Sequence, residues 1–155
     1  MRYFGRLNYA ITATVIGLLS ASAWPNMAAA EQPRPCSDYD QDFALYFESD
    51  RATPSQTGIM VLEQALNNLK DAHYCQISAV IVTGHQDRAG SREYNEALSM
   101  AMAFGIADEL MARGIPLEKI QRLSRGESQM ATPTPDGARE PLNRRVEIQI
   151  SMRTK

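Results

Sequence analysis

The stretch from residue 79 to residue 105, AVIVTGHQDRAGSREYNEALSMAMAFG, indicates how the whole chain folds. It opens as a run of β-branched and apolar residues, which is typical of a strand covered on both faces. A loop with His85 and Asp87 follows, and a helix is predicted from Ser91 to Arg113, where a glycine ends it. The stretch is therefore predicted to form a strand, a polar loop and a long helix, which together make an α/β unit.

Strands and helices also alternate on either side of this unit. Before it, residues 42–49 alternate as a strand, and Thr53 is the predicted N-cap of a helix, with Pro54 at the first helical position and Gln56 completing a capping box. The elements predicted after it are a strand over 119–126, a loop over 127–141 and a strand over 144–152. The order βαβαβ-β predicts an α/β (α+β) two-layer sandwich, with two helices on one face of a mixed four-stranded sheet.

Each predicted helix carries apolar residues at the three- and four-residue spacing of a helix that packs on a sheet. The predicted faces are Ile59, Leu62, Leu66 and Leu69 in the first helix, and Tyr94, Leu98, Ala101, Gly105 and Leu110 in the second. We expect both faces to contact the sheet.

The first thirty residues have the order of a secretory signal peptide. Arg2 and Arg6 precede an apolar segment, and three alanines ending at Ala30 precede the first acidic residue. Residues 1–30 are therefore predicted to be removed, residues 31–41 to form an extended leader and residues 42–152 to form the domain. The alternative is an uncleaved anchor, but the apolar segment is short for a span of about 20 residues. We expect no integral membrane segment in the mature chain.

Charge and cysteines limit the partners and the compartment. Removing residues 1–30 removes two arginines and no acidic residue, which leaves 14 basic and 18 acidic residues, a net charge of −4. Such a chain lacks the basic surface that nucleic-acid binding needs. Cys36 and Cys75 both lie in the exported part, where they either form a disulfide or remain as two thiols.

The loop after the central strand allows three kinds of chemistry. A metal site is disfavoured because only His73 offers a second imidazole beside His85, and catalysis is disfavoured because no serine or cysteine stands in a nucleophile motif. The third is ligand binding: Asp87 would hold an ammonium, and the amides at the start of the helix would hold a carboxylate. The alternative to ligand binding is a purely structural loop. In that case the glycines only permit the turn, His85 packs against its neighbours, and Asp87 caps the helix. No cofactor is expected.

Two separated motifs stand out along the chain. The first consists of Gly84, His85, Asp87, Gly90, Ser91, Tyr94, Asn95, Leu98 and Ser99 in the loop and helix, and the second of Asn143, Arg144, Arg145 and Val146 at the last strand. Together they resemble the C-terminal domain family of outer membrane protein A, which peptidoglycan-associated lipoproteins and flagellar stator proteins share. The resemblance covers about residues 42–152.

This resemblance implies a periplasmic protein that binds non-covalently to the peptide stem of peptidoglycan, at the zwitterionic end of diaminopimelate. The implied binding residues are Asp87, Asn95, His85, Ser91 and Arg144, with Asp87 on the ammonium. It also implies a non-enzymatic role, and possible envelope-protein partners through which the protein would associate with the outer membrane.

Two positions depart from the family pattern: Gln86 stands where the family usually has threonine, and Met102 stands where it has the helix arginine that pairs with the stem's carboxylate. The change at Gln86 is the milder one, because it keeps a polar side chain. A thioether cannot replace the bidentate contact of a guanidinium. Either Arg88, Arg92 or Arg144 reaches the vacant place, or the domain has become an envelope interaction or scaffold module without peptidoglycan binding.

In the scaffold hypothesis, Met100, Met102 and Phe104 offer an apolar surface to a partner, and Asn143 and Arg145 fix the last strand. Core packing is the alternative role for the methionines. A hydrolase that uses His85 and Asp87 is the third hypothesis.

Overall fold

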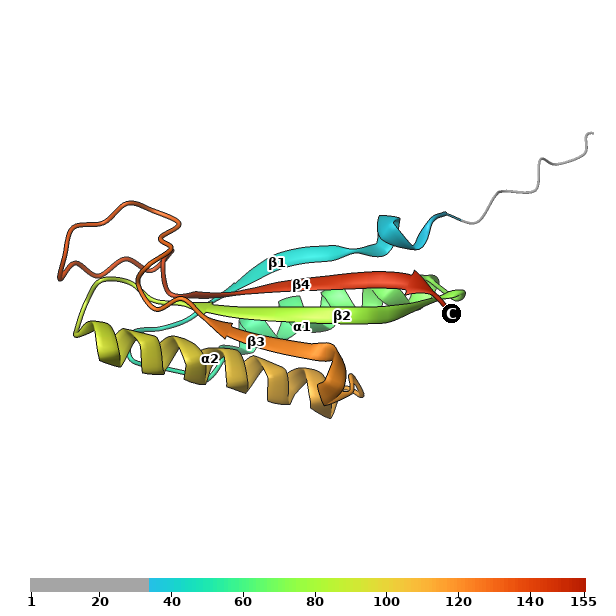
Figure 1. Cartoon of the computed structure of the whole chain (residues 1–155), viewed down its shortest axis with the longest axis horizontal. Coiled ribbons are helices and arrows are strands. Elements are labelled where there is room, and N and C mark those ends of the chain that lie inside the picture. The colour runs from blue at the N-terminus through green and yellow to red at the C-terminus, as the bar shows by residue number, and fades with distance from the viewer. Residues whose placement is uncertain (1–33) are drawn as a thin grey trace, which may run out of the picture. The chain divides into compact units, whose positions relative to one another are not determined.

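The computed structural model of the chain describes residues 34–155 (Figure 1). The predicted signal peptide, residues 1–30, lies outside the described residues. Within the predicted leader, residues Cys36–Tyr39 form a short 3-10 helix and the first strand already begins at Gln41. The prediction of an extended leader is therefore wrong for this part. The physical reason is tethering, because Cys36 is joined to Cys75 and the Asp40 carboxylate accepts a hydrogen bond from the Met152 amide.

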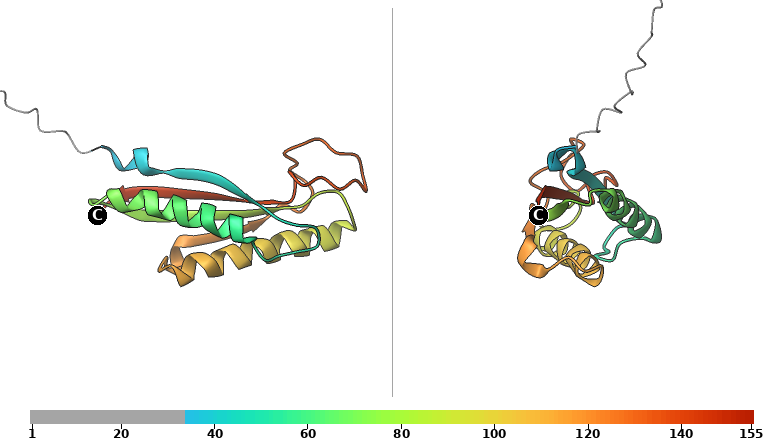
Figure 2. Two further views of the ribbon diagram at one scale, coloured as in Figure 1. Left: turned by 180° about the vertical axis from the view of Figure 1, so that it is seen from behind. Right: turned by 90° about the vertical axis from the view of Figure 1, so that its right-hand side faces the viewer.

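Four strands and two helices make up the domain. They are β1 (Gln41–Tyr46), α1 (Gln56–Asn68), β2 (Cys75–His85), α2 (Arg92–Ala112), β3 (Ile120–Ser124) and β4 (Arg145–Thr154). The strand order is β1-β4-β2-β3, with β4 antiparallel to both of its neighbours and β2 parallel to β3. Both helices lie on the same face of this mixed sheet (Figure 2). The predicted two-layer α+β sandwich is confirmed.

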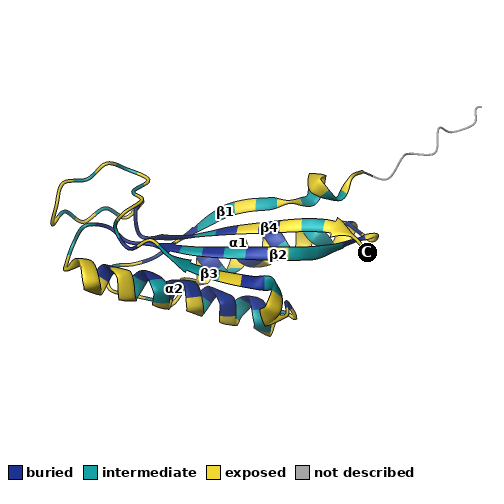
Figure 3. Ribbon diagram, in the orientation of Figure 1, coloured by how far each residue is buried: buried dark blue, intermediate teal, exposed yellow. Residues whose placement is uncertain are grey.

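Strand β2 has one covered face, because both helices lie on the same side of the sheet. Val80 and Val82 point into the core and are fully buried, whereas Ile81 is half-buried and Ala79 is exposed (Figure 3). The prediction of a strand covered on both faces is therefore wrong. The apolar run nevertheless identified the centre of the sheet.

Helix α2 presents a different face to the sheet from the one predicted. Its buried residues are Asn95, Ser99, Met102, Ala103, Ile106, Ala107 and Leu110. Of the predicted face, Leu110 is buried, Leu98 and Gly105 are half-buried, and Tyr94 and Ala101 are exposed. The error follows from ranking residues by apolar character, because small and polar residues occupy the contact where helix and sheet approach most closely.

The close approach lies between Gly84 of β2 and Ser99 of α2. A Cβ atom on Gly84 would lie 1.9 Å from the Ser99 carbonyl oxygen. The Ser99 hydroxyl also accepts a hydrogen bond from the Gly126 amide and lies 2.5 Å from the Ser124 hydroxyl. These contacts fix the start of α2 against the ends of β2 and β3.

Helix α1 begins two residues later than predicted. Ser55, not Thr53, is the N-cap, and its hydroxyl accepts a hydrogen bond from the Gly58 amide at 3.1 Å. Pro54 therefore precedes the cap. In the predicted face of α1, Leu62 is fully buried and Leu66 packs against the core.

Cys36 and Cys75 form a disulfide with a Cα–Cα distance of 5.7 Å. It joins the segment before β1 to the first residue of β2 and spans 39 residues of sequence. Among residues 34–155, no helix combines the length and the apolar character that crossing a bilayer requires.

Candidate functional site

A small hollow of about 90 Å³ lies where three segments meet: the chain after β1, the loop between β2 and α2, and the segment before β4. Its lining is mostly polar. It consists of Ser49, Asp50, Gln86, Asp87, Ala89, Gly90, Tyr94, Asn95, Arg139 and Arg144. Of the predicted binding residues, the structure thus brings together Asp87, Asn95 and Arg144.

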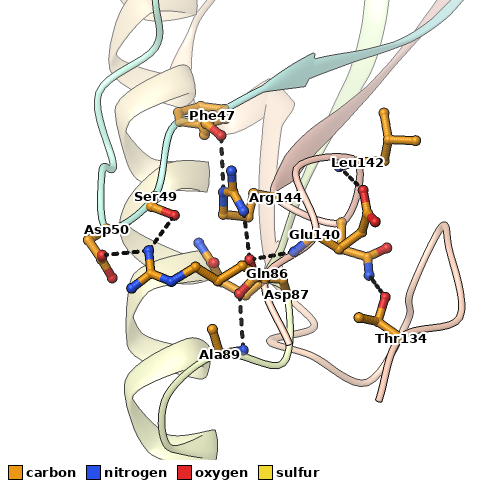
Figure 4. Close-up of polar contacts among 12 residues, drawn as sticks. Phe47, Ser49, Asp50, Gln86, Asp87, Ala89, Thr134, Glu140, Leu142 and Arg144 are labelled. Carbon is orange, nitrogen blue, oxygen red and sulfur yellow. Dashed lines mark hydrogen bonds and ion pairs between the residues drawn. The ribbon is translucent and has the colours of Figure 1, made fainter. Parts of the chain in front are cut away.

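Asp87 is buried, with only 4% of its side chain exposed. Its carboxylate accepts hydrogen bonds from three groups of the chain (Figure 4). Its Oδ2 accepts hydrogen bonds from Arg144 Nη1 at 2.7 Å and from the Glu140 amide at 3.1 Å. Its Oδ1 accepts from the Ala89 amide at 3.1 Å. Ser91, rather than Asp87, caps α2 by accepting from the Tyr94 amide. Asp87 therefore connects the loop after β2 to the segment before β4.

The two arginines of the hollow differ in how much of their hydrogen-bonding capacity is used. Arg144 pairs with Asp87 and also donates from Nε to the Phe47 carbonyl, at 3.3 Å, so it is held at the end of β1. Arg139 lies nearer the solvent: its Nη1 donates to Ser49 Oγ at 2.9 Å and lies 3.7 Å from Asp50 Oδ2. Arg144 is a buried structural cation, whereas Arg139 is an accessible one.

Asp50 has an unusual backbone conformation, with φ of 59°. Aspartate tolerates this left-handed region better than most residues. Its Oδ1 accepts a hydrogen bond from the Tyr94 hydroxyl at 3.2 Å, and this bond joins the turn after β1 to the first turn of α2. The conformation thus places a second carboxylate at the rim of the hollow.

Asn95 is buried and donates from Nδ2 to Glu127 Oε2 at 2.6 Å. It lines the hollow and joins α2 to the loop after β3. Ser91 and His85, two other predicted binding residues, do not line the hollow. Ser91 is exposed and acts as the helix cap.

His85 is almost completely buried beneath the loop that follows β3. Its Nδ1 lies 3.2 Å from the Gln129 carbonyl oxygen, and its Nε2 lies 3.4 Å from Glu147 Oε2. Burial lowers the pKa of His85 below its ordinary value of 6.5, and the positive charge of Arg145 lowers it further, although Glu147 acts in the opposite direction. These partners are separate from those of Asp87, so the structure does not form the His85 and Asp87 dyad that the hydrolase hypothesis needs.

Met102 lies in the core, with no exposed surface. The Gln86 side chain lines the hollow and donates from Nε2 to Met102 Sδ at 2.8 Å, so Met102 lies behind Gln86. The predicted apolar surface is therefore wrong at Met102. Met100 is half-buried, and only Phe104 of the three is exposed, with the Arg122 guanidinium 4.4 Å from its ring centre.

Of the three arginines considered for the vacant place, only Arg144 lines the hollow. Arg88 pairs with Asp136 and donates to the Thr134 carbonyl, while Arg92 is exposed on the first turn of α2. Asn143 holds the loop before β4 through two hydrogen bonds with Thr132, at 2.9 Å each.

Sequence reasoning missed Ser49, Asp50 and Arg139 as members of the hollow. Asp50 and Arg139 are separated by 89 positions along the chain, and neither stands in a recognisable binding motif. The only signal in the sequence was that the stretches containing these residues, LYFESDR and GARE, lie within the part that resembles the family.

A larger cleft of about 690 Å³ lies between the end of α1, the start of β2 and the end of α2. Leu66, Ile77, Ile115 and Met152 contribute much of its wall, and none of the predicted binding residues lines it. Within the described part of the chain, no cluster of three or more histidine, cysteine, aspartate or glutamate side chains is placed to hold a metal ion.

Two helices on one face of a β1-β4-β2-β3 sheet, with a polar hollow beyond the end of β2, define an OmpA-like α+β domain. The chain belongs to the OmpA family, whose sequence model matches residues 46–144.

Curated relatives and solved structures agree with this assignment. The chain is 36% identical over 115 residues to outer membrane protein A of Klebsiella pneumoniae. This match covers 68% of this chain and 33% of that protein. The match to outer membrane protein A of Escherichia coli O157:H7 is 32% identical, with the same coverage. The chain matches less than half the length of these relatives: 25% of outer membrane protein A of Klebsiella aerogenes and 47% of that of Escherichia fergusonii.

The OmpA-like domain of FopA1 from Francisella tularensis subsp. tularensis SCHU S4 has a TM-score of 0.62 at 25% identity, and the match covers 74% of this chain and 73% of that one. The peptidoglycan-associated lipoprotein of Burkholderia pseudomallei has a TM-score of 0.57 at 24% identity, covering 71% and 89%, and shows the shared fold.

Proposed function

We propose that the protein binds non-covalently to the peptide stem of peptidoglycan, with the zwitterionic end of diaminopimelate in the hollow beside Asp87. The observation that carries this proposal is the meeting of carboxylates and guanidinium groups in one small hollow. Membership of the OmpA family and similarity in fold to a peptidoglycan-associated lipoprotein support it.

The chemistry of the hollow suits a zwitterion. Asp50 and Asp87 supply negative charge, and Arg139 and Arg144 supply positive charge, so neither sign dominates. Asp87 Oδ1 accepts one hydrogen bond from the chain and retains capacity for an ammonium donor. At about 90 Å³ the hollow is much smaller than the roughly 300–1,000 Å³ pockets that hold whole drug-sized ligands, so it would take one end of a longer molecule.

The proposed location is the periplasm of a cell envelope. Residues 1–30 would direct export, residues 31–155 would form the mature protein, and residues 42–152 would form its OmpA-like domain. Association with the outer membrane would come through envelope partners. In this role the protein binds the cell wall and catalyses no reaction.

The test is retention of residues 31–155 on insoluble peptidoglycan. This chain contains the whole compact unit Pro33–Lys155. We expect retention on diaminopimelate-type peptidoglycan and weaker retention on lysine-type peptidoglycan, which lacks the carboxylate next to the stem's terminal ammonium. Equal retention on both materials, or none on either, would contradict the proposal.

An interaction or scaffold module without peptidoglycan binding is the second candidate. Two points favour it: Met102 stands where the resemblance to the family implies an arginine, and Asp87 is already paired with Arg144. Gln86 lies between Met102 and the hollow, so Met102→Arg alone would place a guanidinium in the core. Restoring the family pattern requires Gln86→Thr together with Met102→Arg.

The double substitution distinguishes the two candidates. If the parent chain remains in the supernatant and the double variant is retained on peptidoglycan, the fold has kept the shape of the site but lost its ligand. The scaffold role would then be favoured, and the parent's partners would be envelope proteins.

A further inference from the structure

We propose that Arg139 is a specificity-determining residue of the hollow, and that its guanidinium binds the carboxylate of the ligand. This inference rests on the proposed function and names the group that would recognise the acidic part of the zwitterion. The carboxylate would be held by the segment before β4, and not by α2.

The first argument is the unused capacity of Arg139. A guanidinium has five N–H donors in a planar arrangement that matches a carboxylate. The contacts of Arg139 with Ser49 and Asp50 both use Nη1, and its Nε and Nη2 make no hydrogen bond with any residue from 34 to 155. Its side chain is 64% exposed. Arg144, by contrast, is 10% exposed and pairs with Asp87 at 2.7 Å.

The second argument is that the backbone beside Arg139 is held in place. The next residue, Glu140, donates its amide hydrogen to Asp87 Oδ2, and the Gly137 amide donates to the Arg88 carbonyl at 2.9 Å. Hydrogen bonds therefore fix the chain on both sides of Arg139. A binding group on a restrained segment loses less conformational freedom when its ligand arrives.

The third argument is that the segment carrying Arg139 is hydrogen-bonded to Asp87. Because the amide of residue 140 bonds to Asp87, the backbone carrying Arg139 is one hydrogen bond away from the Asp87 carboxylate. The amino-acid end of diaminopimelate carries its ammonium and its carboxylate on one carbon atom, so its receptor needs an anion and a cation side by side. Asp87 and Arg139 come from two different segments and line the same hollow of about 90 Å³, so they can supply the anion and the cation.

The fourth argument excludes the helix as the source of the cation. Met102 is fully buried behind Gln86, and Arg92 on the first turn does not line the hollow. Of the residues that line it, the two basic ones are Arg139 and Arg144.

The experiment compares the apparent Kd of residues 31–155 for diaminopimelate-type and lysine-type peptidoglycan. We expect Arg139→Ala to weaken binding to the diaminopimelate type by at least about tenfold and to remove the preference between the two materials. Arg139→Lys should give an intermediate preference, because it keeps the charge and loses the bidentate geometry. Arg92→Ala is the matched control, an exposed arginine of the same region, and should behave as the parent.

The outcomes separate this inference from the proposed function. If the parent prefers diaminopimelate-type peptidoglycan and Arg139→Ala keeps that preference, the inference is wrong and the proposed function stands. If the parent shows no retention or no preference, both fail. Thermal unfolding of each variant checks the fold, and Arg139→Ala should unfold near the parent's temperature because its contacts lie at the surface.

Discussion

The buried pair of Asp87 and Arg144 lines the hollow and also holds the surrounding segments together. It joins two segments 57 positions apart, and the surrounding bonds to Phe47 and Glu140 extend it to the end of β1 and the loop before β4. A buried pair contributes little beyond a well-packed apolar pair, but removal of one partner leaves an uncompensated charge. The site and the fold therefore depend on the same carboxylate.

Asp87→Ala should lower the free energy of unfolding by about 3–5 kcal/mol, because Arg144 would remain buried without its partner. Urea denaturation followed by circular dichroism measures this change. Asp136→Ala is the matched control: this carboxylate also pairs with an arginine, but its side chain is 83% exposed. It should alter the unfolding midpoint far less, and similar effects of the two variants would contradict the role assigned to burial.

His85 should make stability depend on pH. Its pKa in the folded state is lowered by burial, so below about pH 6.5 the unfolded chain binds a proton that the folded chain does not. The free energy of unfolding should therefore decrease as pH falls from about 6.5 toward the lowered pKa of the folded state. In His85→Gln this part of the dependence should disappear.

Urea titrations between pH 5 and pH 7.5, about the range in which histidine titrates, measure this effect. His73→Gln provides the comparison, because His73 is exposed on the segment before β2. A parent-like slope in His73→Gln and a flatter one in His85→Gln are expected. The same slope in all three proteins would exclude His85 as the cause.

The sequence identified Asp87, Asn95 and Arg144 because they stand in motifs, yet it could not identify their partners. Arg139 and Asp50 approach each other only after the turn following β1 and the loop before β4 have folded over the end of β2. The position of Met102 behind Gln86 was equally inaccessible, since it depends on which face of α2 meets the sheet.

At the scale of elements, the contact between β2 and α2 sets the geometry of the domain. Gly84 lets the backbone of α2 approach the strand, and the Ser99 hydroxyl lies 2.5 Å from the Ser124 hydroxyl of β3. The loop that carries Asp87 begins at Gln86, two residues after Gly84, and connects β2 to the closely packed α2. The helix packing thus determines where Asp87 lies.

Gly84→Ala should destabilise the protein by about 1–3 kcal/mol or more, because the added Cβ would lie 1.9 Å from the Ser99 carbonyl oxygen and the helix would have to move. Gly58→Ala is the control within α1. There a Cβ would lie 3.5 Å from its nearest neighbour, the Ser55 hydroxyl, so the change should be neutral or stabilising by about 0.5–1 kcal/mol. Thermal denaturation distinguishes them, and equal stability of the two variants would contradict this packing model.

The number, type and order of the elements could be predicted from apolar periodicity, whereas their contacting faces could not. Helix α2 buries Ser99 and Ala103 in place of the larger Tyr94 and leaves Phe104 exposed. Hydrophobicity ranks these residues in the opposite order. Close backbone approach favours small residues, and one sequence does not reveal where that approach occurs.

At the scale of the whole molecule, the disulfide joins the chain before β1 to the start of β2. Replacing both cysteines with serine should lower the free energy of unfolding by about 4 kcal/mol, the chain-entropy value for a loop of this length. Urea denaturation with and without a reducing agent measures it. The reductant should weaken the parent to the level of the double variant and leave the variant unchanged. A parent indifferent to reduction would contradict the prediction.

The strand order has a consequence for how the protein is made. Strand β4 is the last of the four strands described in residues 34–155, yet it lies between β1 and β2 and is the neighbour of both. Until β4 emerges, β1 has no hydrogen-bonding partner in the sheet and β2 has only β3. The arginine that neutralises Asp87 also arrives with this last segment. A nascent chain therefore has neither a complete sheet nor a balanced charge pair until β4 and the segment before it have been synthesised, so the sheet and the hollow are completed together.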